Sequence, residues 1–201
     1  MAKPADRGRV TALILAAGSS SRLGKPKQLL LIDGETLIHR VARIATSSTV
    51  DETIVVVGNC ASDVERAVMD LPCRIIENPD FAEGQSTSFK AGIRAIDEST
   101  DAVVVILGDQ PLVAKVAVDA VVNVWRGTRA PLVQAEYRGV RSHPVLFDRS
   151  VFPDLMNVSG DTGASQVLRA RREQIVPARI DGDVPLDIDT LDDYRRVLEL
   201  I

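Results

Sequence analysis

The chain has 201 residues and a formal net charge of −4, with a pI near 5.3. This acidic balance argues against a surface for nucleic acid or anionic lipid, although a locally basic pocket can still bind a small anion. Hydrophobic residues make up 45% of the chain and aromatic residues only 3%, as is typical of parallel strands buried between helices. We therefore expect one α/β domain over residues 10–201, preceded by a disordered polar tail over residues 1–9.

The sequence gives no sign of export or membrane insertion. Residues 1–9 lack the apolar stretch of a secretion signal, and no later segment has the apolar length of a membrane span. Cys60 and Cys73 are isolated in the sequence, too few for a disulfide framework and without metal-ligand spacing. These features predict a cytoplasmic protein with reduced thiols and no membrane partner.

Apolar, β-branched runs alternate with segments that carry apolar residues at helical spacing. This alternation predicts a three-layer α/β/α architecture around a mostly parallel sheet, with a ligand outside the C-terminal ends of the strands. In the first half, the predicted strands are 11–17, 53–58, 73–77 and 102–108, and the predicted helices are 36–46, 61–70 and 86–97. In the second half, helices are predicted at 113–125, 163–171 and 191–200, and strands at 132–136, 144–147 and 186–188, with a turn near Gly139.

The stretch at 13–30, LILAAGSSSRLGKPKQLL, is a predicted strand that leads into a basic loop of small residues. Gly18 and a second glycine let the backbone lie close to a ligand, and Arg22, Lys25 and Lys27 supply positive charge. Five residues separate the two glycines, and a proline follows the first lysine, so the loop is not a P-loop. It also lacks the GxGxxG fingerprint. We interpret it as a triphosphate-binding loop, with a solvated surface loop as the alternative.

A second candidate site is the sequence VVVILGDQP at 103–111, where a predicted buried strand ends in Gly108 and Asp109. The C-terminal ends of parallel strands meet at one edge of a sheet, so Asp109 is expected near the basic loop. A carboxylate there can bind a magnesium ion that bridges phosphate oxygens. The alternative is that Asp109 caps the helix that follows.

The third candidate is the acidic sequence LDIDTLDDY at 186–194. Asp187 and Asp189 alternate with apolar residues on a predicted strand, so they project to one face, and at least one of them is a candidate metal ligand. The two later aspartates fall in the first turn of the last helix, where negative charge suits the helix dipole. Thr190 is the predicted N-cap of that helix.

Six blocks resemble, in order and spacing, those of the molybdenum cofactor nucleotidyltransferases. The resemblance extends from about residue 10 to the C-terminus and is greatest to the cytidylyltransferase branch, which joins CTP to molybdopterin. It implies a Rossmann-like nucleotidyltransferase fold. The blocks are LAAGSSSRLGKPKQLL at 15–30, NPDFAEGQSTSFKAG at 78–92, LGDQPLV at 107–113, HPVLF at 143–147, GDTGA at 160–164 and DIDTLDDY at 187–194.

The resemblance also implies roles for individual residues. Arg22 and Lys27 match positions that grip the triphosphate, and Asp109 matches the magnesium aspartate, with Asp187 or Asp189 completing the metal site. The Ala-Ala-Gly triplet resembles the cytidylyl branch, because the guanylyl branch usually has Ala-Gly-Gly or Gly-Gly there. The implied catalytic residues are Arg22, Lys27 and Asp109; the nucleotide-binding residues also include Leu15, Ala16, Ala17, Gly18, Gly84, Ser86 and Gly108; the acceptor-binding residues are Gln110, His143 and Pro144.

Two positions depart from the family pattern on the side implied for the pterin. Ser142 stands where glycine commonly precedes His-Pro, and Ser165 stands where arginine commonly follows Gly-Asp-x-Gly-Ala. The sequence therefore defines the acceptor less well than the nucleotide. For His143, a hydrogen-bonded structural role is the alternative to catalysis.

The resemblance implies a magnesium-dependent enzyme that transfers a nucleoside monophosphate from an NTP, with CTP favoured, to the terminal phosphate of molybdopterin and releases pyrophosphate. A molybdoenzyme or an accessory chaperone is the implied recipient of the product. The alternatives are a guanylyltransferase or a sugar-phosphate nucleotidyltransferase, a redox enzyme acting on another heterocycle, and a non-catalytic carrier of the cofactor.

Overall fold

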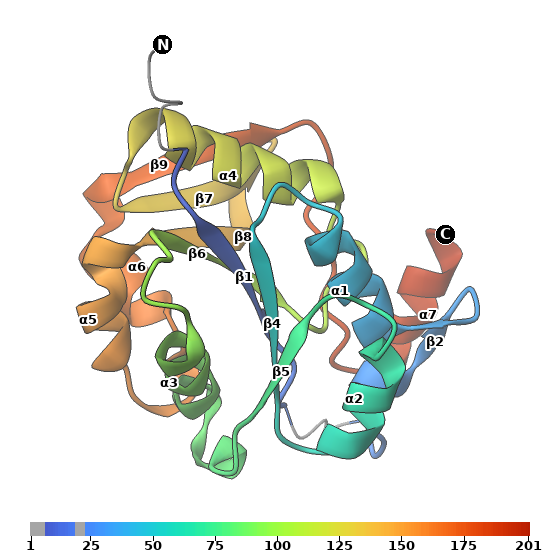
Figure 1. Ribbon diagram of the computed structural model, residues 1–201. Helices are drawn as coiled ribbons and strands as arrows, with labels where there is room; N and C mark the ends of the chain where they lie inside the picture. The colour runs from blue at the N-terminus through green and yellow to red at the C-terminus, as the bar shows by residue number, and fades with distance from the viewer. Residues whose placement is uncertain (1–6, 19–22) are drawn as a thin grey trace.

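The computed structural model describes residues 7–18 and 23–201. Its centre is a seven-stranded sheet in the order β5-β4-β1-β6-β8-β7-β9 (Figure 1). All neighbouring strands run parallel except that β8 is antiparallel to both β6 and β7. The strands are β1 (Val10–Leu15), β4 (Glu52–Val57), β5 (Arg74–Glu77), β6 (Ala102–Leu107), β7 (Leu132–Tyr137), β8 (Val140–Asp148) and β9 (Ile175–Ile180), with β2 (Leu31–Ile32) and β3 (Glu35–Thr36) forming a separate hairpin.

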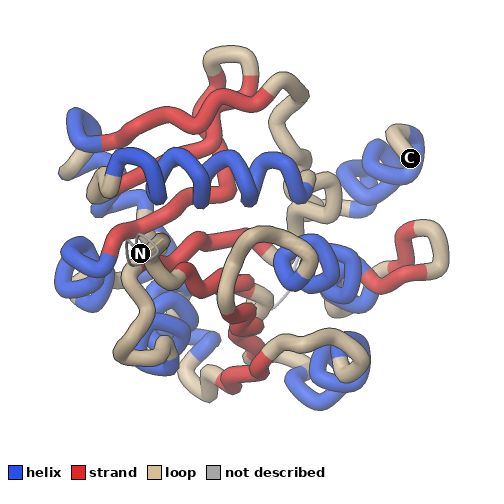
Figure 2. Tube along the Cα trace, turned by 45° about the horizontal axis from the view of Figure 1, so that its top comes forward, coloured by secondary structure: helices blue, strands red, loops and turns tan. Residues whose placement is uncertain are grey.

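Helices cover both faces of the sheet (Figure 2), so the predicted three-layer, mostly parallel α/β architecture is confirmed. The α-helices are α1 (Leu37–Thr46), α2 (Ala61–Val68), α3 (Gln85–Ala95), α4 (Lys115–Thr128), α5 (Phe152–Met156), α6 (Ser165–Ala170) and α7 (Leu191–Glu199). The short 3-10 turns are η1 (Lys27–Leu29), η2 (Phe81–Glu83), η3 (Arg149–Val151), η4 (Gly160–Thr162) and η5 (Arg172–Gln174). Among the helices of the described residues, none is long and apolar enough to cross a membrane.

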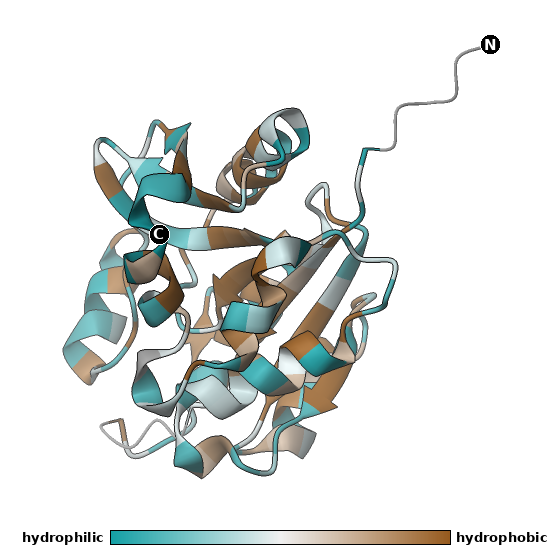
Figure 3. Ribbon diagram, turned by 90° about the vertical axis from the view of Figure 1, so that its left-hand side faces the viewer, coloured by the Kyte–Doolittle hydropathy of each residue, from teal (hydrophilic) through white to brown (hydrophobic). Residues whose placement is uncertain are grey.

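Each layer of helices closes its own hydrophobic core against the sheet. Because side chains alternate along a strand, Ala12 and Ile14 of β1 face the core of α1, α2, α4 and α7, whereas Leu13 faces that of α3, α5 and α6. In the second core, the rings of Phe89 and Phe147 meet edge to face at 6.0 Å. Figure 3 shows the hydrophobic residues concentrated on the strands between the helices. This packing holds the ends of β1 and β6 side by side.

Several predicted elements differ from the observed ones. The strand predicted at 186–188 is wrong: this segment is irregular, and the Ile188 amide donates to the Asp109 carbonyl instead of to a strand. The analysis of periodicity missed β9, where Pro177 and Arg179 interrupt the apolar pattern, and it missed α5. It also missed the β2–β3 hairpin, whose turn is an Asp-Gly pair with positive φ at both residues.

Of the tail predicted over residues 1–9, residues 1–6 lie outside the described residues. Residues 7–9 are held against the sheet: the backbone N–H of Arg9 donates to the Asp101 carboxylate at 2.8 Å, and Arg7 pairs with Asp51. The neighbouring N–H of Val10 also donates to Asp51, at 2.9 Å. The contacts with the fold therefore begin before the predicted boundary at residue 10.

Candidate active site

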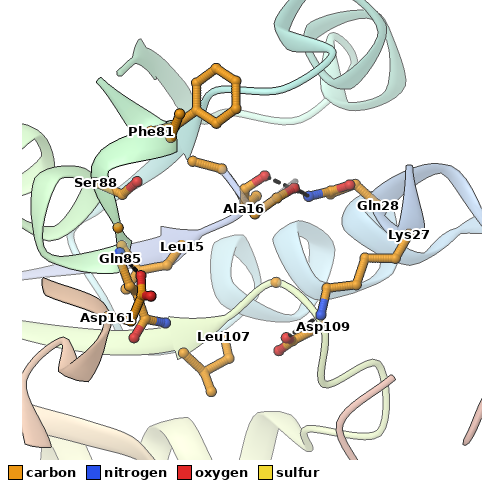
Figure 4. A pocket seen from close by; sticks show the side chains of 15 residues that line it. Leu15, Ala16, Lys27, Gln28, Phe81, Gln85, Ser88, Leu107, Asp109 and Asp161 are labelled. Atoms are coloured by element: carbon orange, nitrogen blue, oxygen red, sulfur yellow. Dashed lines mark hydrogen bonds and ion pairs between the residues drawn. The ribbon is translucent and has the colours of Figure 1, made fainter. Parts of the chain in front are cut away.

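A pocket of about 390 Å³ lies at the C-terminal ends of β1 and β6 (Figure 4), the edge of the sheet that the sequence predicts for a ligand. One wall is the chain that leaves β1, a second is the end of β6, and a third is the segment around η2 and the start of α3. The lining residues are Leu15, Ala16, Ala17, Gly18, Lys27, Gln28, Phe81, Ala82, Gly84, Gln85, Ser88, Leu107, Gly108, Asp109 and Asp161.

One buried side chain fixes the backbone of the segment that follows β1. The amide of Gln28 donates to the carbonyls of Ala16 and Gly18, at 2.9 and 3.0 Å, and Gln28 is only 2% exposed. These bonds turn two carbonyls toward Gln28. A Cβ placed on Gly18 would have no atom within 4 Å, so the space beside this glycine is open. The sequence analysis missed Gln28, because a glutamine beside two leucines gives no signal of this role.

Gly108 brings the second wall close to the first. A Cβ at this position would lie 2.8 Å from the Leu15 carbonyl oxygen and 3.1 Å from the Ala16 Cβ. The Gly108 amide donates to that same Leu15 carbonyl at 3.0 Å. Only glycine permits this approach without a shift of backbone, so Gly108 fixes the spacing between the two strand ends and thereby the position of Asp109.

The third wall is organised by Asn78, which is buried and donates its amide to Thr87 Oγ1 and Ser88 Oγ, both at 2.9 Å. Gln85 and Ser88 lie three residues apart on α3 and therefore share a face, and both line the pocket. Ser86, predicted to bind nucleotide, is buried and absent from the lining. The helical phase puts Ser88 where Ser86 was expected.

Asp161 adds a carboxylate to this wall. It belongs to η4, lines the pocket, and accepts a hydrogen bond from the backbone N–H of Gln85 at 3.3 Å. Gly84 has a positive φ of 113°, and a Cβ there would lie 2.7 Å from the Asp161 carboxylate. Asp161 lies in the GDTGA block and had no predicted role, because aspartates are common in turns and solvated loops.

The opposite end of the pocket carries a lysine between two carboxylates. Lys27 Nζ lies 2.7 Å from Asp109 Oδ2 and 2.9 Å from Asp189 Oδ1, and the Lys27 side chain is 12% exposed. Burial alone would lower the pKa of this ammonium, but the Asp109 charge and the hydrogen bonds to both carboxylates outweigh it, so the pKa is raised. Lys27 is therefore a cation held at the edge of the pocket.

The irregular segment before α7 brings in the other predicted carboxylate. Gln110 donates its amide to Asp187 Oδ1 at 2.8 Å, and burial raises the pKa of Asp187 while this hydrogen bond lowers it. Asp187 and Asp189 thus both reach the end of β6, although not as part of a strand. Gln110, predicted to bind the acceptor, is 2% exposed and absent from the pocket lining, and its side-chain amide is hydrogen-bonded to Asp187.

These residues fit a divalent cation. Asp109 Oδ1 is buried and has no hydrogen-bond partner among the described residues, and carboxylate oxygens are the ligands that Mg²⁺ prefers. Among residues 7–18 and 23–201, no three His, Cys, Asp or Glu side chains form a group that could hold a metal ion. Lys27 lies between Asp109 and Asp189. The capping alternative for Asp109 is wrong, because the N-cap of α4 is Ala114.

Three predicted site residues remain: Arg22, His143 and Pro144. Arg22 is outside the described residues. His143 and Pro144 are joined by a cis peptide bond, and neither lines the pocket. Burial lowers the pKa of His143 to about 4, against the opposing charge of Asp109, so the imidazole is neutral at neutral pH. The Tyr137 hydroxyl donates to the His143 carbonyl at 2.9 Å.

The sequence is similar to those of known proteins. Residues 12–175 match the model of the MobA-like NTP transferase domain. The chain is 31% identical over 200 residues to nicotine blue oxidoreductase of Paenarthrobacter nicotinovorans, covering 94% of this chain and 96% of that protein. It is 27% identical over 186 residues to molybdenum cofactor cytidylyltransferase of Escherichia coli, covering 92% and 93%.

A solved structure agrees with this family relationship. Rv0371C of Mycobacterium tuberculosis, in complex with manganese, superposes with a TM-score of 0.84 at 30% identity, covering 96% of this chain and all of that one (100%). The family model spans most of the chain, and the pocket lies where the fold predicts a ligand. The chain belongs to the family of the MobA-like NTP transferase domain and is a nucleotidyltransferase.

Proposed function

We propose that this nucleotidyltransferase transfers CMP from CTP to the terminal phosphate of a molybdopterin-type cofactor, in a reaction that depends on Mg²⁺. The observation that carries the proposal is the Lys27–Asp109–Asp189 cluster at the open end of a pocket with glycine at its walls. A pocket with a lysine and carboxylates at one end suits a triphosphate and its metal ion. The named cytidylyltransferase relative supports the choice of reaction.

In this proposal the phosphates lie at the lysine end of the pocket. Lys27 holds the β- and γ-phosphates, together with Arg22, and the exposed face of Gly18 lets the backbone approach them. Asp109, with Asp187 or Asp189, holds the magnesium ion. When bound, the ion neutralises charge that develops on the α-phosphate and the leaving pyrophosphate. The manganese in the Rv0371C structure supports a divalent cation in this family.

The proposed reaction needs residues that position the two substrates, and it does not need a residue that removes a proton from the acceptor. A terminal phosphate monoester is already anionic, so its oxygen can attack the α-phosphorus in line, forming one P–O bond as the bond to pyrophosphate breaks. No strong general base is required. The lowered pKa of His143 is consistent with a neutral side chain that packs beside the site and does not carry charge to it.

The choice of CTP rests on the first wall of the pocket. Ala16, Ala17 and Gly18 line it in the triplet that resembles the cytidylyl branch. The choice of CTP therefore rests on this resemblance and on the relative named molybdenum cofactor cytidylyltransferase.

One observation favours a second candidate function. The relative with 31% identity over 200 residues is named as an oxidoreductase, so the same pocket in this family could serve redox chemistry on a nitrogen heterocycle. The two candidates make different predictions for nucleotide binding. A transferase binds CTP with a divalent cation, whereas an oxidoreductase binds a redox cofactor.

The test is the melting temperature with each of CTP, GTP, ATP and UTP, and with NADPH or NADH, each in the presence of Mg²⁺. A ligand that binds only the folded state raises the melting temperature according to its affinity and concentration. We expect a selective rise with CTP. A selective rise with GTP would assign the chain to the guanylyl branch, a rise with NADPH or NADH alone would favour the oxidoreductase, and no rise with any nucleotide would contradict the proposal.

A further inference from the structure

Lys27 lies where the proposed function needs a divalent cation. Its Nζ contacts Asp109 Oδ2 at 2.7 Å and Asp189 Oδ1 at 2.9 Å, with 12% of the side chain exposed. Asp109 and Asp189 are also carboxylates that the proposed function assigns to the metal ion. A second cation beside the ammonium would be repelled by it, and burial of the Lys27 side chain strengthens the repulsion.

The carboxylates around Lys27 outnumber its charge. The Lys27 ammonium lies against two carboxylates, those of Asp109 and Asp189, so one positive charge faces two negative ones. One oxygen of this group, Asp109 Oδ1, is buried without a hydrogen-bond partner among the described residues. Lysine therefore satisfies the cluster in part, and a divalent ion would satisfy it more fully.

We propose that Lys27 is the resident counter-ion of the carboxylates in the nucleotide-free enzyme and turns to the phosphates when a nucleotide binds, so that metal and triphosphate each raise the other's affinity. Lysine suits such a movement, because its charge lies at the end of a flexible four-carbon stem. The inference rests on the proposed function in taking the pocket to bind a triphosphate with a divalent cation.

The coupling follows from thermodynamic linkage. A triphosphate that draws Lys27 away removes a competitor from Asp109 and Asp189, so it raises their affinity for a divalent cation. The metal must raise the affinity for triphosphate by the same factor. A divalent cation alone has to displace the ammonium without a new partner for it, so we expect it to bind weakly to the wild-type enzyme in the absence of nucleotide.

The experiment measures binding of Mn²⁺ alone, followed by its electron paramagnetic resonance signal, to the full chain without nucleotide. The variants are Lys27→Met and Lys27→Gln, the second of which keeps a hydrogen-bond donor for Asp109. Lys115→Met is the matched control, because Lys115 is an exposed lysine on α4 that does not line the pocket. Asp109→Asn identifies binding that depends on the cluster, and circular dichroism checks that each variant is folded.

We expect both Lys27 variants to bind Mn²⁺ about tenfold or more tightly than the wild type, and Lys115→Met to match the wild type. Asp109→Asn should abolish the gain. Equal or weaker Mn²⁺ binding by the folded Lys27 variants, with binding still sensitive to Asp109→Asn, would overturn the inference and leave the proposed function standing. If no variant shows Mn²⁺ binding that depends on Asp109, the metal site of the proposed function is contradicted, and this inference with it.

Discussion

Asp109 and Ile188 are joined by a backbone hydrogen bond of 3.0 Å, in which the Ile188 amide donates to the Asp109 carbonyl. Ile188 is fully buried, so the contact fixes the segment before α7 at the end of β6. It brings Asp187 to Gln110 and Asp189 to Lys27. The acidic cluster is therefore formed by segments that are far apart in sequence and that meet at the sheet edge.

Gln110→Leu tests whether a buried amide positions Asp187. The variant removes the 2.8 Å hydrogen bond to Asp187 Oδ1 and leaves the carboxylate free to rotate. Loss of a partner that orients a metal ligand typically costs 10-fold to 100-fold in metal affinity, so we expect the Mn²⁺ affinity to fall by about tenfold. Gln174→Leu, at an exposed glutamine, is the control. Unchanged Mn²⁺ affinity in Gln110→Leu would contradict this role.

Gln28→Leu tests the support of the β1 loop. The side chain donates to the carbonyls of Ala16 and Gly18, and leucine cannot. Because Ala16 is buried, its carbonyl would lose a partner away from water, at a cost of about 1–3 kcal/mol in the free energy of unfolding. Urea denaturation measures the change. The account also expects weaker nucleotide binding, and a variant as stable as the wild type would show that the loop needs no such support.

Gly92→Ala tests the packing of α3 on the sheet. A Cβ at Gly92 would overlap the Leu13 side chain, which is fully buried. We expect a loss of about 1–3 kcal/mol of stability. Gly127→Ala is the matched control on α4: nothing lies within 4 Å of its Cβ position, so the better helix propensity of alanine should add up to about 1 kcal/mol. A gain at both sites, measured by thermal unfolding, would contradict the close approach of α3.

His39 gives a prediction for pH. Burial would lower its pKa from the ordinary 6.5, but hydrogen bonds to Glu35 and Asp70 outweigh it and raise it. A raised pKa in the folded state stabilises the fold fully below the unfolded pKa, and this contribution is lost as pH rises through the folded pKa. The stability gap between wild type and His39→Gln should thus be larger near about pH 5.5 than near about pH 9. Thermal unfolding at the two pH values measures it, and a constant or inverted gap would contradict the assignment.

The sequence predicted the parts of the fold that depend on local periodicity. The unbroken apolar runs of β1, β4 and β6 predict strands that are buried on both faces, as observed. The amphipathic spacing of α1 predicts a helix with one buried face, which packs against the sheet. Local periodicity gave a wrong prediction for the segment at 186–188. Its alternation resembles a strand, but its backbone bonds with a loop carbonyl, and no periodicity reveals the bonding partner.

In the candidate site, too, some residues could be predicted from the sequence and others could not. The sequence places Lys27, Gly108 and Asp109 at one edge, because strand ends and the glycine-rich loop converge there. It could not place Gln28, Asn78 or Asp161, whose roles depend on contacts between segments that are distant in the chain. Such residues become visible only when the structure shows which carbonyls and hydroxyls they satisfy.

Nucleotidyl transfer to a phosphate acceptor moves the α-phosphorus of CTP to the product, so we would measure transfer of label from CTP labelled at that atom. The assay contains a molybdopterin-type acceptor and Mg²⁺, and it records both the labelled product and released pyrophosphate. We predict equal amounts of the two from the wild type, and loss of both in folded Asp109→Asn. Wild-type enzyme that yields no labelled acceptor, or Asp109→Asn that keeps most of the activity, would contradict the account.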